Sequence, residues 1–120
     1  MVRAMAADLR PRFAASDLRR YTAAVLAWYG VPEADAALGA EVLVDADLAG
    51  IESHGIAHLP WHPGYAPGFD RGIVNPKPAV AVLRDSPVAA TWDADGGMGI
   101  IVGQKAMAAA MEKARVTGLG

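Results

Sequence analysis

The sequence predicts a mixed α/β protein in which an N-terminal helical region precedes a β-hairpin and a further helix. Two apolar segments with helical spacing come first, a stretch dense in proline and glycine follows, and two short β-prone runs then lead into an alanine-rich segment. The 120 residues fit the usual size of one structural domain. Within it we expect residues 1–78 to form a helical subdomain with a linker, and residues 79–120 to begin an α/β domain.

The first helix is predicted to start at Ser16, a residue type that commonly caps helix N-termini, and to stop at Gly30. Apolar side chains recur between them at helical spacing: Leu18, Tyr21, Val25, Trp28 and Tyr29.

A second helix is predicted with Pro32 in its first turn and an end near Leu48 or Gly50. Its apolar residues are spread around more than one face, so we expect it to be largely buried. Asp45 and Asp47 would then be buried carboxylates that need partners.

The remaining elements follow from turn-forming and β-prone residues. Residues 60–78 contain too many prolines and glycines for a long helix, so we expect a linker with one or two helical turns. Two strands, one including Val80 and Val82 and the other including Val88 and Trp92, should flank a turn. A third helix is predicted over 102–116, with Gly118 as its stop. Because two strands make a marginal sheet, we expect the chain to be the N-terminal part of a longer protein.

The overall composition excludes several classes of function. The formal net charge is −2 and no basic stripe is present, so we expect no nucleic-acid partner. No apolar run is long enough to cross a bilayer and no signal-peptide core is visible, so we expect a cytoplasmic protein without a membrane partner. The chain has no cysteine, which rules out a thiolate nucleophile within it.

The Ser53-His54-Gly55 step directly follows the second predicted helix. A side chain at such a boundary is held by a rigid element and can still face a cleft. His54 is therefore the candidate catalytic residue, and Ser53 could orient its ring or bind a ligand. The alternative interpretation is that His54 caps the helix by bonding to its last carbonyl groups.

An ordered set of motifs resembles the malate/L-lactate dehydrogenase family, a non-Rossmann family that includes ureidoglycolate and sulfolactate dehydrogenases. The matching residues cover nearly all of the chain in the right order: Ala46-Asp47-Leu48, Gly50-Ile51, Ser53-His54-Gly55-Ile56, Leu59-Pro60, Gly72-Ile73, Asn75-Pro76, Asp95-Gly96-Gly97, Gly99, Ala106-Met107, Ala114 and Gly118.

The resemblance implies a homodimeric enzyme that uses NAD or NADP and transfers a hydride to or from a small 2-hydroxy acid, 2-keto acid or imino acid. His54 would line the substrate pocket as the proton acceptor, because the reference pKa of histidine lies near neutral pH. Family members commonly carry an arginine four residues later and a tyrosine four further on. This chain has His58 and His62 at those positions, so its substrate-binding set is Ser53, His54, His58 and His62. The chain alone is expected to be inactive, because further site residues of the family come later in the sequence.

Three alternatives remain open from the residues alone. His54, His58 and His62 are four positions apart and could suggest a metal site, but Pro60 and Pro63 interrupt the row and we expect no metal. The glycines at 96, 97, 99 and 103 could cradle a phosphate or allow close packing, and the sequence assigns no cofactor contact. The chain could also be a truncated, non-catalytic relative that acts as a binding or dimerisation module.

Overall fold

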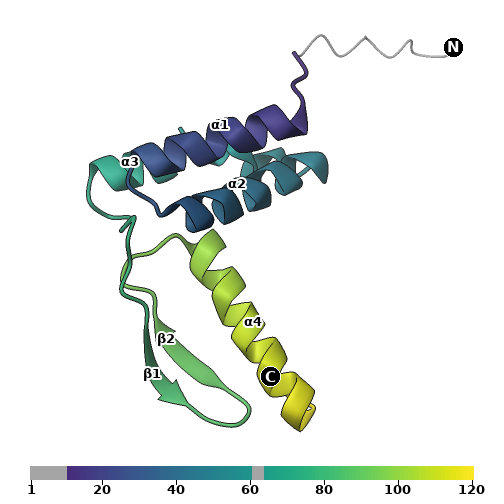
Figure 1. Ribbon diagram of the computed structural model, residues 1–120, viewed down its shortest axis with the longest axis vertical. Coiled ribbons are helices and arrows are strands. Elements are labelled where there is room, and N and C mark those ends of the chain that lie inside the picture. Colours follow the sequence, from purple (N-terminus) through teal and green to yellow (C-terminus); the bar gives the residue numbers. More distant parts are fainter. Residues whose placement is uncertain (1–10, 61–63) are drawn as a thin grey trace, which may run out of the picture.

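The computed structural model describes residues 11–60 and 64–120, and it confirms the mixed α/β class. Two helices, α1 (Ala15–Trp28) and α2 (Glu33–Leu48), lie side by side. The short helix α3 (Tyr65–Asp70) lies against one end of this pair (Figure 1). The strands β1 (Ala81–Asp85) and β2 (Ala90–Asp93) and the helix α4 (Gly99–Thr117) extend together away from α2 (Figure 1).

The helix α1 begins before the predicted cap. Its N-cap is Ala14, whose carbonyl oxygen accepts from the N–H groups of Asp17 and Leu18, so the prediction of Ser16 as the cap is wrong. The backbone alone closes this first turn, and no side chain caps it. Gly30 ends the helical segment as predicted, with a positive φ of 94° that glycine adopts without strain.

The helix α2 follows after a short turn and ends where the sequence predicted, at Leu48. Pro32 is its N-cap rather than a residue of the first turn. One face packs on α1 and is fully buried: Ala36, Gly39, Ala40, Leu43 and Val44. Small residues on this face let the helices approach closely, and a Cβ at Gly39 would lie 3.0 Å from Leu26 Cδ1. Glu41 and Leu48 are exposed, so only part of the predicted burial is found.

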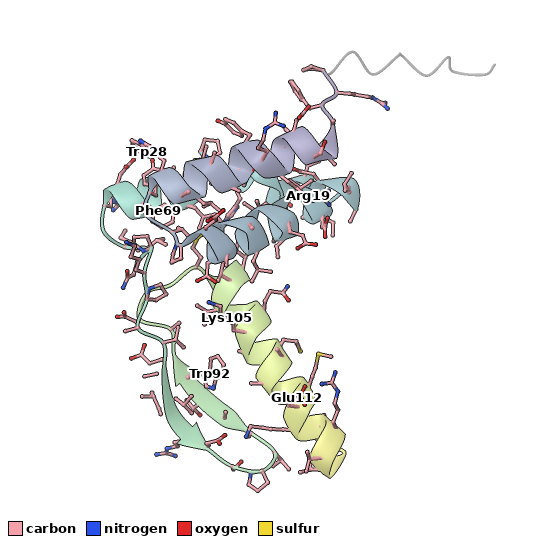
Figure 2. The ribbon with its side chains drawn as sticks, in the orientation of Figure 1. Arg19, Trp28, Phe69, Trp92, Lys105 and Glu112 are labelled. Carbon is pink, nitrogen blue, oxygen red and sulfur yellow. The ribbon has the colours of Figure 1, made fainter. Side chains whose placement is uncertain are left out.

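Asp45 lies on the outer side of α2, and the prediction that its carboxylate is buried is wrong. Its side chain is 55% exposed and forms an ion pair of 2.6 Å with Arg19 of α1. Figure 2 shows Arg19 on the part of α1 that lies over α2. The helical rotation that turns Leu43 and Val44 inward turns Asp45 outward.

The strands form an antiparallel hairpin in which Val82 pairs with Trp92 and Arg84 with Thr91. The register shifts between these two pairs, so β1 contains an irregularity there. The first predicted strand is confirmed, although it begins one residue after Val80. The second begins at Ala90, so the placement of Val88 in a strand is wrong. A turn includes Val88, because the Ser86 N–H bonds to the Ala89 carbonyl.

The helix α4 begins at Gly99 and ends at Thr117, and its C-cap Gly118 has the left-handed φ of 80° that the predicted stop requires. Its start is buried against the helical pair through Ile101 and Val102. Lys105 bonds to Asp35 of α2 at 2.7 Å, and Figure 2 shows Lys105 on the end of α4 nearest α2.

A single apolar cluster holds the parts of the chain together. Its buried members come from α1, α2, α4 and the segments next to them: Leu26, Val31, Ala36, Leu59, Met98 and Ile101. Leu59, 3% exposed, directly follows the predicted site segment and fixes it to this core. None of the helices described here has the length and apolar character that a membrane span requires. The division at residue 78 stays a prediction.

Candidate functional site

The predicted site residues lie on two consecutive 3₁₀ turns that follow α2. The first turn is η1 (Glu52–His54) and the second is η2 (Ile56–His58). Ser53 and His54 are exposed, and His58 is half-buried. The buried Leu59 anchors the end of the segment, so the predicted site side chains are on a surface that the core supports.

Asp47 and Gly55 fix the path of the chain between the two turns. The Ile56 N–H donates a hydrogen bond of 2.9 Å to Asp47 Oδ2, across nine residues of sequence. The carboxylate lies directly on the Cα of Gly55, because a Cβ built there would be 1.8 Å from Asp47 Oδ1. Only glycine fits beneath this carboxylate. The predicted need of Asp47 for a partner is confirmed, and the partner is the backbone of the site segment.

Ser53 and His54 form a hydrogen-bonded pair. Ser53 Oγ lies 2.9 Å from His54 Nδ1. If Nδ1 carries the proton and donates it to the hydroxyl, Nε2 has a free lone pair and can accept a proton from a ligand. If the hydroxyl donates instead, Nε2 carries the hydrogen and can only give one. The pair can therefore act as a proton acceptor or as a proton donor, depending on the tautomer of His54.

The side chain of His54 is not the cap of α2 that the alternative interpretation required. The α2 C-cap is Ala49, whose N–H donates a hydrogen bond to the Asp45 carbonyl group. Gly50 and Ile51 N–H groups bond to Asp47 and Ala46 carbonyls in the same turn. The helix end is therefore satisfied by backbone groups, and His54 is available for another role.

His58 lies beside His54 with its ring nearly parallel. The two centroids are 6.4 Å apart and the planes differ by 7°. His58 also meets the Tyr65 ring edge-to-face, with the centroids 5.4 Å apart. Burial raises the pKa of the Tyr65 hydroxyl, so this phenol is a neutral hydrogen-bond donor. Three rings from η1, η2 and α3 thus form a row that no sequence pattern indicated.

The structure contains a cavity of about 320 Å³ between the hairpin and α4, away from the predicted site residues. A smaller cavity of about 210 Å³ lies against His58. The larger cavity is lined by Trp92, Lys113 and several alanines, and none of the predicted site residues borders it. The smaller cavity borders His58, Tyr65 and Arg71. Neither Tyr65 nor Arg71 was identified from the sequence, because no motif connects them to the histidines.

Two further predictions concern metals and phosphates. His62 lies outside the described residues, so the row of three histidines is described only through His54 and His58. Within residues 11–60 and 64–120, no three His, Asp or Glu side chains come together as a group that could hold a metal ion.

The glycine segment runs from the turn before α4 into the helix itself. Gly99 and Gly103 lie inside α4, and a Cβ at either position would meet nothing within 4 Å. Close packing occurs only earlier, where a Cβ at Gly97 would lie 2.7 Å from Pro78 Cγ. The close-packing interpretation is therefore supported at Gly97, and the phosphate interpretation stays a prediction.

Comparison with known proteins identifies the family. The sequence model of malate/L-lactate dehydrogenase matches residues 13–120. The chain belongs to the malate/L-lactate dehydrogenase family. Among its relatives, the L-sulfolactate dehydrogenase of Methanocaldococcus jannaschii is 46% identical over 96 residues, which is 80% of this chain and 27% of that protein. The malate dehydrogenase of Pyrococcus abyssi is 42% identical over 109 residues, which is 91% of this chain and 29% of that protein.

Solved structures of this dehydrogenase family share the fold. The malate dehydrogenase of Pyrococcus horikoshii superposes with a TM-score of 0.86 at 37% identity, covering 97% of this chain and 32% of that one. The sulfolactate dehydrogenase of M. jannaschii superposes with a TM-score of 0.79 at 42% identity, covering 84% of this chain and 28% of that one. This chain therefore spans less than a third of the length of these dehydrogenases.

Proposed function

We propose that this chain supplies part of the substrate site of an NAD- or NADP-dependent oxidoreductase that acts on a small 2-hydroxy acid or the corresponding keto acid. The observation that carries the proposal is the Ser53–His54 pair, hydrogen-bonded at 2.9 Å on an exposed and core-anchored turn. Family membership supports the reaction class, because relatives are named malate, sulfolactate and lactate dehydrogenases.

In this proposal, His54 Nε2 accepts the proton of the substrate hydroxyl while the bond from carbon to hydrogen breaks. The Ser53 hydroxyl accepts from Nδ1–H and so holds the ring in the tautomer that leaves Nε2 free. NAD or NADP, when bound, would accept the hydride and become reduced. We assign no residue of this chain to the cofactor.

His58 is proposed to assist in binding the substrate acid. It lies parallel to His54 at 6.4 Å, so one small ligand can reach both rings. A protonated imidazole can pair with a carboxylate, although it lacks the planar double contact of an arginine. His62 stays a predicted substrate residue on family resemblance alone, and a cytoplasmic homodimer stays a prediction as well.

The test is a nicotinamide absorbance assay on the gene product at its full length, with L-malate, L-lactate and their keto acids and with each cofactor. We expect turnover with at least one pair. The His54→Gln variant should lose about 10²–10⁴-fold in kcat, which is the usual contribution of general acid–base catalysis. The control is Arg84→Gln on the exposed strand β1, which should keep wild-type turnover. Full activity in His54→Gln would contradict the assigned role, and no turnover with any 2-hydroxy acid would contradict the function.

A further inference from the structure

The cavity of about 210 Å³ beside His58 is lined by apolar residues together with one permanent cation, Arg71. Pro67, Ile73 and Val74 provide apolar lining, while His58, Tyr65 and Arg71 provide polar groups. Arg71 is the C-cap of α3 and Tyr65 is the first residue of the same helix. Two ends of one short helix therefore bring a guanidinium and a phenol to the cavity that His58 borders.

The charge of this cavity is positive. Among the described residues that line it, Arg71 is a permanent cation and none is acidic. The carboxylate of Asp70, next to Arg71 in the sequence, accepts a hydrogen bond from the Tyr29 hydroxyl. Desolvation, together with the charge of Asp70 and this hydrogen bond, raises the pKa of Tyr29. Arg71 already has an interaction partner in the structure, so an anion would share the guanidinium, whose five N–H donors permit this.

We propose that this cavity, which we name the His58–Arg71 pocket, binds the second acidic group of a 2-hydroxy diacid. This proposal rests on the proposed function, because His54 has to handle the hydroxyl end of the same molecule. The His58 ring lies 6.4 Å from the His54 ring and 5.4 Å from the Tyr65 ring, measured between centroids, and His58 lines the pocket, so a ligand held by His54 lies next to a residue of the pocket wall. A diacid such as malate, or a sulfonate analogue, carries a second anionic group where lactate has only a methyl group.

The size of the pocket favours a small acid over a large ligand. At about 210 Å³ it is below the roughly 300 Å³ at which pockets for drug-sized molecules begin. It has room for the terminal oxy-acid group of a short substrate and not for a dinucleotide. Arg71 supplies to this pocket a planar, permanently charged group that can pair with a carboxylate through two parallel hydrogen bonds.

The experiment compares L-malate with L-lactate on the full-length gene product by isothermal titration and by turnover. Removing a charge-assisted contact to a carboxylate typically weakens binding by about tenfold to a hundredfold. The Arg71→Gln variant should show this loss for L-malate and less than a twofold change for L-lactate. The Arg71→Lys variant, which keeps the charge, should recover part of the malate affinity. The Arg84→Gln variant is the matched control, since it removes an exposed arginine from β1.

The outcomes separate this inference from the proposed function. If 2-hydroxy acids are turned over and Arg71→Gln changes malate and lactate equally, the pocket assignment is wrong while the function stands. If no acid is turned over but L-malate binds in an Arg71-dependent manner, the pocket stands and the function is wrong. Equal malate binding by wild type and Arg71→Gln, with unchanged thermal unfolding, also overturns the inference. Binding of inorganic phosphate with the same affinity as L-malate would show a general anion site and overturn the diacid assignment.

Discussion

Replacing Gly55 with alanine should disrupt the link between α2 and the site segment. The added Cβ would lie 1.8 Å from Asp47 Oδ1 and 2.2 Å from its Cγ, far inside any real contact distance. The half-buried carboxylate has to move by more than 1 Å, and this movement breaks its 2.9 Å hydrogen bond to the Ile56 N–H.

The expected cost follows from that bond. A hydrogen bond to a charged group contributes about 1.5–3 kcal/mol, and Ile56 N–H would also be left without this acceptor. We therefore expect Gly55→Ala to lower the free energy of unfolding by about 2 kcal/mol. For a domain of this size, each kcal/mol lowers Tm by roughly 4–8 °C, so Tm should fall by about 10 °C.

The assay is thermal and urea unfolding followed by circular dichroism. Gly99→Ala is the matched control, because a Cβ at Gly99 meets nothing within 4 Å and this residue is in a helix that alanine favours. The Gly99→Ala variant should have an unchanged or slightly higher free energy of unfolding. In an Asp47→Ala background, Gly55→Ala should cost less than about 0.5 kcal/mol, since the obstructing carboxylate is gone. A Gly55→Ala cost that is the same in both backgrounds would refute this explanation.

Two further predictions concern the row of polar rings. Ser53→Ala should lower kcat by about 2- to 12-fold with little change in KM, because a neutral hydrogen bond of about 0.5–1.5 kcal/mol selects the His54 tautomer. In steady-state assays, a change confined to KM would contradict this role of Ser53. Burial raises the pKa of Tyr65 above 10.0, so the folded state favours the neutral phenol. Its contribution to stability is therefore complete below pH 10 and is lost as pH rises through the raised value. Above pH 10, the urea midpoint should consequently fall less steeply with pH in Tyr65→Phe than in wild type. Parallel plots of urea midpoint against pH for the two proteins would argue against this role of Tyr65.

The helices were predictable because their signals are local. Gly30 and Gly118 stop α1 and α4 through left-handed backbone, and the sequence places both correctly. The start of α1 was not predictable, because a backbone turn at Ala14 replaced the side-chain cap expected from Ser16. Val88 was misplaced for a similar reason, since Ser86 closes a turn that extends over it.

The candidate site was predicted only in part. The sequence by itself determined the helices, the hairpin and the Ser53-His54-Gly55 step, because periodicity, turn residues and motifs act over a few neighbouring positions. The tertiary structure decided that Asp47 holds the site segment while Asp45 faces Arg19, because the packed face of α2 sets which carboxylate points inward. It also decided that the Tyr65 ring meets His58 and that Arg71 lines the same cavity. Those contacts depend on how α3 folds back onto η2, and that arrangement is fixed by packing around Leu59 and the shared core rather than by spacing along the chain.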